Sequence, residues 1–235
     1  MDIHRFYRPL LTYFRRRRME RFARLFAITE STTVLDLGGG PFNWSLLAPR
    51  PRLTVMDINT KTPGVRDEIV YLCGDGCDTQ LPARSFDVVF SNSVIEHVGE
   101  VNRQKQFAKE CMRCGRGYYV QTPNKWFPVD PHTFLLFAHW LPKKVFNKIM
   151  WISPRFLMSK PSQEDIEDFQ NMRLLGKRDL QDLFPGAEII RERFLGITKS
   201  LIAVSKERPQ SASQSSSPAA AGSARAEAGK PSHNP

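Results

Sequence analysis

Apolar residues in this chain form short runs that alternate with helically spaced positions. Seven runs rich in aliphatic and β-branched residues predict strands, at residues 32–37, 52–58, 69–73, 86–91, 117–121, 187–194 and 198–205. Helical spacing predicts helices at about 9–27, 43–47, 102–114 and 177–184, with Pro9 in the first turn of its helix. Strands that alternate with helices indicate a parallel sheet with right-handed crossovers.

The end of the pattern differs, because the last two strands are separated only by Leu195 and Gly196. So short a connection allows only an antiparallel hairpin. The predicted fold is therefore α/β and doubly wound, with a seven-stranded, mostly parallel sheet that ends in an antiparallel hairpin.

Composition divides the chain into three parts. Residues 1–30 form a basic helical segment, residues 31–205 hold the alternating pattern, and residues 206–235 are rich in Ser, Ala, Gln and Pro. The last part has no aromatic residue, so we expect it to be disordered. Residues 122–175 interrupt the pattern with aromatic residues, Pro and Lys, and insertions of this kind lie above the carboxyl ends of the strands.

The net charge of +10 is concentrated near the N-terminus, where residues 1–26 hold eight Arg against Asp2 and Glu20. A basic arm suits anionic lipid, nucleic acid or an acidic partner, and a solvated helix face has the same pattern. The longest apolar run, residues 134–141, is too short to cross a bilayer and ends at Pro142. With no signal-peptide pattern, the sequence predicts a cytoplasmic protein.

Four cysteines are present, at positions 73, 77, 111 and 114. The pair at 111 and 114 has the CxxC spacing of a zinc site, but the other pair is more loosely spaced. We expect reduced, partly buried thiols and no metal.

Candidate chemistry begins at TVLDLGGGPFNW, residues 33–44. A strand that runs through Gly38–Gly40 into a helix brings bare backbone N–H groups close to a ligand. The carboxylate of Asp36 suits a cationic or hydroxylated ligand and would repel the phosphates of a dinucleotide. The loop therefore indicates a nucleoside cofactor with an ammonium group and no phosphate, which describes S-adenosylmethionine (SAM).

Polar residues at three later strand ends extend this site. Asp57 ends the second strand, 21 residues after Asp36, where it can accept both ribose hydroxyls of SAM or of NAD. Asp75, ahead of Gly76, can accept a hydrogen bond from an adenine amino group. Asn92 lies between two serines at the end of the fourth strand and lines the crevice.

Five motifs in this order resemble the class I SAM-dependent methyltransferases, of the group related to ubiquinone and small-molecule methyltransferases. They are VLDLGGG at 34–40, VMDI at 55–58, GDG with LP at 74–82, FDVVFSNSVIEHV at 86–98 and YYVQTPN at 118–124. The resemblance covers residues 31–125 and extends through the hairpin to about 205. It implies a Rossmann-like fold and a transferase activity.

The resemblance also implies roles for individual residues. The implied cofactor site consists of Asp36, Gly38, Gly39, Gly40, Asp57, Ile58, Asp75, Gly76 and Asn92. Asp36 and the glycines would hold the methionine part of SAM, with Asn92 nearby. Asp57 would hold the ribose, Ile58 would flank the adenine, and Asp75 would meet the adenine amino group.

The chain departs from the family at Phe42, where a third motif glycine is usual. That glycine matters less for SAM than for a dinucleotide, because SAM has no pyrophosphate. Phe42 and Trp44 either cover the cofactor or pack in the core, and we expect core packing.

Methyl transfer mainly requires in-line positioning, with a base where the acceptor is a hydroxyl. Candidate bases are Glu96, His97, Asp130, His132 and His139, and our preferred catalytic base is His132, on the insertion. A structural histidine has the same sequence signature.

The predicted acceptor is a small or lipid-like molecule under the aromatic insertion. Methylation of nucleic acid is a second hypothesis, against which SNSV stands where an NPPY or DPPY tetrapeptide would follow the fourth strand. A degenerate, non-catalytic SAM-binding or interaction module is the third. An NAD oxidoreductase is disfavoured, because Asn43 stands where the dinucleotide fingerprint has Gly or Ala.

The N-terminal helix and the insertion both combine aromatic and basic residues. We expect both to lie over the crevice and form the acceptor pocket, with arginines and lysines facing an anionic membrane surface or an acidic acceptor. The alternative is that the helix caps the sheet and the aromatic residues fill its core. The oligomeric state and the methylated atom stay open.

Overall fold

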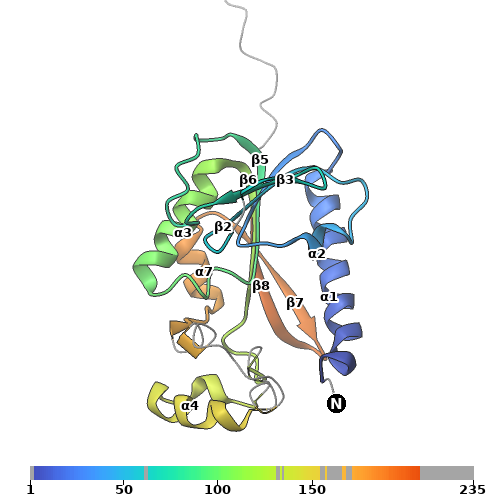
Figure 1. Ribbon diagram of the computed structural model, residues 1–235. Helices are drawn as coiled ribbons and strands as arrows, with labels where there is room; N and C mark the ends of the chain where they lie inside the picture. The colour runs from blue at the N-terminus through green and yellow to red at the C-terminus, as the bar shows by residue number, and fades with distance from the viewer. Residues whose placement is uncertain are drawn as a thin grey trace, which may run out of the picture.

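The protein is built around one eight-stranded sheet (Figure 1). The computed structural model describes residues 3–60, 63–130, 133, 135–153, 157, 166–167 and 171–206, with side chains from residue 12 onward. The strand order is β3-β4-β2-β1-β5-β6-β8-β7. The strands are β1 (Thr33–Leu37), β2 (Arg52–Asp57), β3 (Gly64–Arg66), β4 (Ile69–Cys73), β5 (Phe86–Asn92), β6 (Gly115–Pro123), β7 (Glu188–Phe194) and β8 (Ile197–Ser205).

Strand pairing confirms the predicted fold class. The central strands β4, β2, β1, β5 and β6 are parallel, whereas β8 pairs antiparallel with both β6 and β7. Leu195 (φ 48°) and Gly196 (φ 82°) connect the hairpin with positive φ at both positions, which matches the twist of the two strands.

The count of seven strands was one short. The additional strand is β3, a three-residue, fully exposed edge strand that pairs antiparallel with β4. Three exposed residues carry no alternation of apolar and polar positions, so the hydrophobic pattern gave no signal for β3.

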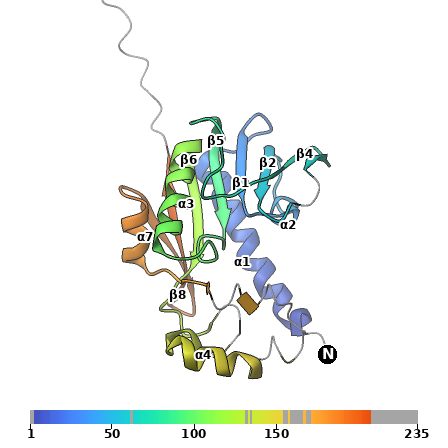
Figure 2. The same cartoon turned by 60° about the vertical axis from the view of Figure 1, so that its left-hand side comes forward.

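Helices cover both faces of the sheet (Figure 2). One face carries α1 (Ile3–Phe26), whose Met19 and Phe22 are buried against Phe90 and Tyr119. The other carries α3 (Val101–Cys114) and α7 (Lys177–Leu183), which bury Phe107 and other apolar side chains. Ring centroids of Phe22 and Phe90 lie 5.0 Å apart, edge to face.

Two helix starts differ from the expectation. The first helix begins at Ile3 rather than near Pro9, so Pro9 lies in the second turn. The missing N–H of proline removes one backbone hydrogen bond, which a 24-residue helix tolerates near its end. The second helix is only α2 (Pro41–Trp44), and proline at its first position presets the backbone angle for helix.

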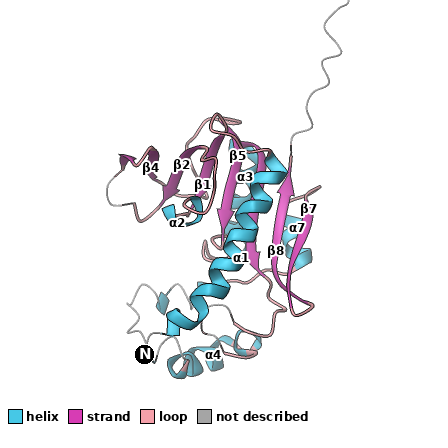
Figure 3. Ribbon diagram, turned by 90° about the vertical axis from the view of Figure 1, so that its right-hand side faces the viewer, coloured by secondary structure: helices cyan, strands magenta, loops and turns pink. Residues whose placement is uncertain are grey.

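The insertion lies beyond the carboxyl ends of the parallel strands. It begins where β6 ends and contains the 3₁₀ helix η1 (Ala138–Trp140), then α4 (Lys143–Ile149) and the 3₁₀ helix η2 (Met150–Ile152). Figure 3 shows α4 at the same end of the molecule as the start of α1. None of the helices in the described residues is long and apolar enough to span a membrane.

Candidate functional site

The glycine loop after β1 has a backbone that only glycine adopts easily. Gly38 has φ +70°, and its N–H donates to the carbonyl of Met56 on β2 at 2.8 Å. A Cβ on Gly39 would lie 1.8 Å from Oδ2 of Asp36, so the carboxylate lies directly against the loop. A Cβ on Gly40 would meet no atom within 4 Å, which leaves open space beside the loop.

Asp36 is a fully buried carboxyl with one unused oxygen. The indole Nε1 of Trp44 donates to Oδ2 at 2.7 Å, whereas Oδ1 has no hydrogen-bond partner among the described residues. Burial raises the pKa of Asp36 to about 7; the Trp44 bond lowers it, and the nearby charge of Asp57 raises it. A cationic ligand beside Oδ1 would offset the cost of ionising this buried group.

The two aromatic residues after the loop have different roles. The expected core packing is correct for Trp44, which is 2% exposed and also orients Asp36. It is wrong for Phe42, which is 45% exposed and lies under the guanidinium of Arg15, 5.2 Å from its ring centroid. Phe42 therefore connects the loop to α1 instead of filling the core.

Asp57 and Ile58 lie beside this loop, because β2 is the parallel neighbour of β1. Oδ1 of Asp57 accepts the backbone N–H of Asn59 at 2.7 Å, which fixes the carboxylate in the turn after β2. Ile58 is 65% exposed, so its apolar side chain is accessible for packing against a flat ring of a ligand.

Asp75 and Gly76 follow β4, the next strand outward. Oδ2 of Asp75 accepts from Arg103 on α3 at 2.6 Å, and Oδ1 accepts from the N–H of Cys77 at 2.8 Å. Burial raises the pKa of Asp75, but these two bonds lower it, and the net shift is downward. A Cβ on Gly76 would lie 2.9 Å from the Phe107 ring, so glycine is needed for packing against α3.

Asn92 ends β5 and accepts a hydrogen bond from Arg18 of α1. Nη1 of Arg18 also donates to Gln121 at 2.9 Å, while Nε and Nη2 bind the carboxylate of Glu192 on β7 at 3.0 and 2.5 Å. Arg21 adds a second contact to Glu192 at 3.4 Å. Arg18 and Glu192 are each 6% exposed, so this is a buried, bidentate ion pair.

The arginines of the N-terminal helix were expected to face an anionic membrane surface or an acidic acceptor, and for the buried Arg18 that expectation is wrong. Arg18 lies four residues after Phe14 and four before Phe22, on the stripe that faces the sheet. This spacing was the available signal. Glu192 had no such signal, because its partner is 174 residues away.

Glu96 is the second fully buried carboxyl at this edge. Its Oε2 accepts from the hydroxyl of Thr122 at 2.9 Å, and Oε1 has no hydrogen-bond partner among the described residues. Burial raises the pKa of Glu96 to about 7, against the lowering effects of hydrogen bonds and of the Arg18 charge. A carboxyl that titrates near neutral pH can accept a proton from a ligand.

The other candidate bases are placed differently. His132 lies outside the described residues. His139 is held in the insertion, with Nε2 3.0 Å from the carbonyl of Lys125 and Nδ1 3.5 Å from Oδ2 of Asp130. Both Asp130 and His97 make contacts within the chain, so neither is set apart as a ligand group.

A cavity of about 440 Å³ opens within the insertion, between residues 125–146 and residues 172–174. Trp126, Trp140 and Phe146 supply its aromatic lining. Its cationic residues are Lys125 and Arg173, which pair with Asp179 at 2.7 and 3.2 Å, and the exposed Lys143. The backbone N–H of Arg173 donates to the carbonyl of Glu96 at 2.9 Å, so one wall of this cavity is joined to the Glu96 segment. A cavity of about 390 Å³ around Phe26, Asp87 and Lys206 lies at the amino ends of β5 and β6, away from these groups.

The cysteines do not form a cluster in the described chain. Cys73 is exposed, whereas the thiols of Cys77, Cys111 and Cys114 are free and buried. Among the residues with described side chains, no three His, Cys, Asp or Glu are grouped to hold a metal ion.

Comparison with protein families gives a match over residues 35–117, about a third of the chain, to a family described as "Methyltransferase domain". The match begins one residue before Asp36 and includes every residue of the implied cofactor site. No curated protein sequence matches the chain.

Solved structures with similarity to this chain include a dehydrogenase and two methyltransferases. A putative Zn-dependent alcohol dehydrogenase from Rhodobacter sphaeroides is 12% identical, covers 77% of this chain and 86% of its own, and has a TM-score of 0.50. A SAM-dependent methyltransferase from Aquifex aeolicus is 13% identical over 79% of this chain and 88% of its own, with a TM-score of 0.45. A putative methyltransferase from an antibiotic biosynthesis pathway of Anabaena variabilis is 16% identical over 58% of this chain and 60% of its own, with a TM-score of 0.43.

Proposed function

We propose that this chain, which carries a class I SAM-dependent methyltransferase domain, transfers the methyl group of SAM to a small or lipid-like acceptor held under the insertion. SAM supplies an electrophilic methyl group on a sulfonium. The protein's task is to hold donor and acceptor in line and to exclude water.

The observation that carries the proposal is the buried, half-satisfied carboxyl of Asp36 against an open glycine loop. Asp36 and Gly38–Gly40 would hold the charged methionine end of SAM, and Asn92 would lie near that end. Asp57 would accept the ribose hydroxyls, and the exposed Ile58 would flank the adenine. Asp75, with Gly76, would meet the adenine amino group while keeping its bond to Arg103, because each carboxylate oxygen can accept more than one hydrogen bond.

Support for the acceptor's place comes from the cavity at the end of β6. Its walls combine tryptophan rings with cationic groups, which suits an apolar or flat molecule with a negative or polar head. It is joined to Glu96, whose carboxyl is ionised in part near neutral pH.

We assign Glu96 as the candidate base for a hydroxyl acceptor, beside the earlier candidate His132. In this role Glu96 takes the acceptor proton on Oε1 while Thr122 holds Oε2. Glu96→Gln keeps the shape and removes the proton-accepting group, so methyl transfer is expected to fall about 10²-fold or more while SAM affinity stays within about twofold.

The rival functions receive less support. A nucleic-acid methyltransferase was suggested by the row of arginines on α1, but Arg18 is buried; Arg16 and Arg17 are exposed and bind Glu20 and Tyr13 of the same helix. The degenerate-module hypothesis rested on Phe42, whose ring lies outward and leaves Gly40 open. We place the reaction in the cytoplasm.

The direct test is incubation of the protein and isotopically labelled SAM with separate lipid and aqueous extracts of cells. Label appearing in a product of either extract, and reduced with Asp57→Ala at limiting SAM, supports methyl transfer. Calorimetry that detects NAD binding and no binding of SAM would overturn the proposal.

A further inference from the structure

The insertion has an unusual number of exposed apolar side chains for a surface segment. Three of the chain's four tryptophans lie in it, and Trp126, Trp140 and Trp151 are 64%, 46% and 51% exposed. Leu136, Phe137, Leu141, Val145 and Ile152 are exposed as well. Such a concentration marks an interaction surface rather than scattered surface residues.

Ring contacts show that the central part of this surface is continuous. The ring centroid of Trp140 lies 5.0 Å from that of Phe137 and 6.2 Å from that of Trp126. The indole N–H of Trp140 donates to the carbonyl of Lys125 at 2.6 Å, which fixes the ring on the insertion. We call Trp126, Phe137 and Trp140 the aromatic face.

Positive charge accompanies the aromatic face. Lys143, Lys144 and Lys148 are exposed on α4, and no ammonium group of the three makes an ion pair or hydrogen bond within the described residues. Between residues 124 and 153 the one acidic residue is Asp130, which is fully buried. The surface of residues 124–153 therefore carries cationic and aromatic groups without an exposed carboxylate among its described side chains. Glu167, an exposed carboxylate of the described insertion, lies outside this stretch and makes a contact within the chain.

We infer that this surface of the insertion, rather than the arginines of α1, docks the protein on an anionic lipid bilayer, with the aromatic face in the headgroup region. Tryptophan rings favour the interface between water and lipid, and lysines near it are attracted to anionic headgroups. Docking on the membrane does not depend on the proposed function. Its consequence does rest on that function: a lipid-like acceptor enters the adjoining cavity from the membrane.

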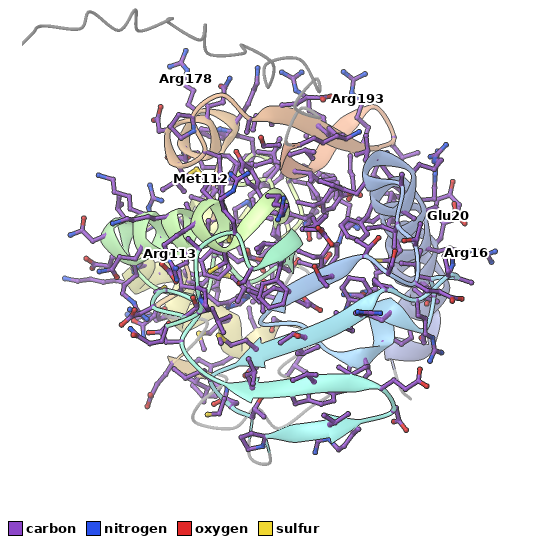
Figure 4. All side chains as sticks on the ribbon, turned by 90° about the horizontal axis from the view of Figure 1, so that it is seen from above. Arg16, Glu20, Met112, Arg113, Arg178 and Arg193 are labelled. Carbon is purple, nitrogen blue, oxygen red and sulfur yellow. The ribbon has the colours of Figure 1, made fainter. Side chains whose placement is uncertain are left out.

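The arginines of α1 are less suited to this role. Arg16 pairs with Glu20 at 3.1 Å, and both lie on the outer side of α1 (Figure 4). Arg17 donates to the hydroxyl of Tyr13 at 2.9 Å, and Arg18 is buried. Of the six arginines with described side chains on α1, three thus contact carboxylates of the molecule itself: Arg16, Arg18 and Arg21.

Co-sedimentation of the full chain, without SAM, with vesicles of phosphatidylcholine alone or mixed with phosphatidylserine tests the inference. We expect binding to the mixed vesicles that weakens with salt. Lys144→Gln with Lys148→Gln should weaken it about tenfold or more, whereas Arg16→Gln with Arg17→Gln, which removes the same charge, should change it less than about threefold.

Tryptophan fluorescence quenched by brominated lipid locates the contact. Quenching is expected for the native chain and not for the triple variant Trp126→Phe, Trp140→Phe, Trp151→Phe, because the remaining Trp44 is 2% exposed. Thermal melts and calorimetry with S-adenosylhomocysteine, the demethylated product of SAM, establish that each variant is folded.

Three results would overturn the inference. One is failure to bind either vesicle while S-adenosylhomocysteine still binds, which would leave the surface to a protein partner and the proposed function intact. A second is a larger loss with the arginine variant, which would place the contact on α1. The third is binding without quenching.

Discussion

The helix α1 and the insertion are both aromatic and basic, yet their charges are used in opposite ways. In α1, Arg18 is buried against Glu192 and holds the helix to β7, while Arg16 pairs with Glu20. In the insertion, Lys144 and Lys148 extend into solvent without an ion pair to a described residue. Similar composition therefore stabilises the fold in one region and leaves exposed lysines without a described ion-pair partner in the other.

The difference between the two regions is tested most directly by removing the buried ion pair. Arg18→Gln leaves Glu192 buried with the 3.4 Å contact of Arg21 and the nearby charge of Lys199, without its bidentate partner. The free energy of unfolding should therefore fall by about 3–5 kcal/mol in urea titrations. Lys148→Gln, the matched change on α4, should alter it by less than about 0.5 kcal/mol. Equal effects of the two substitutions would show that the regions do not differ.

Glu96 links the two regions. Its carboxyl interacts with the charge of Arg18 on α1, and its backbone carbonyl accepts the N–H of Arg173 in the cavity wall. Its pKa is raised from 4.5 to about 7 in the folded chain, so its stabilising effect is present below about pH 4.5 and is lost as pH rises through about 7. Glu96→Gln should therefore increase stability at pH 8 relative to the native chain, by on the order of 3 kcal/mol, with little gain at pH 5. Melts at the two pH values measure this, and a gain independent of pH would contradict it.

The cofactor site should respond independently of both regions. Asp57→Ala is expected to weaken S-adenosylhomocysteine binding by about 1–3 kcal/mol through loss of charge-assisted hydrogen bonds to ribose. Asp182→Ala on α7, which removes an equally charged but exposed side chain, should leave the calorimetric affinity unchanged. An unchanged affinity with Asp57→Ala would remove Asp57 from the site.

The smallest effect is expected where α1 meets the glycine loop. Arg15→Gln removes the guanidinium that lies 5.2 Å from the Phe42 ring centroid, at a cost of about 0.5–1 kcal/mol in thermal melts. Lys144→Gln is the control for the charge itself. A loss no larger than that of Lys144→Gln would mean that the contact with Phe42 contributes nothing.

The sequence predicted the sheet well because its central strands are continuous apolar runs with polar residues at their ends. It also placed Asp36, Asp57 and Asp75 at adjoining strand ends, since parallel strands bring those ends to one edge. Their roles toward SAM stay a prediction.

Other features depended on tertiary contacts. Nothing local indicates that Trp44 donates to Asp36, or that Arg18 reaches Glu192 across the sheet, because both are set by packing between elements. The exposure of the insertion's tryptophans could not be predicted either, because a run of aromatic residues looks the same in the sequence whether it is buried in a core or exposed on a surface. His132 and residues 207–235 lie outside the described chain, so the preferred base and the disordered tail stay predictions.

Calorimetric titration with S-adenosylhomocysteine across pH tests the central claim, that Asp36 and the glycine loop hold the charged end of SAM. The pKa of Asp36 is about 7 in the free protein, so at lower pH the carboxyl is neutral and must release its proton to hold an ammonium group. The account predicts affinity that rises severalfold from about pH 6 to about pH 8, and a nearly flat profile for Asp36→Asn. Absence of binding, or the same pH profile in both proteins, would contradict it.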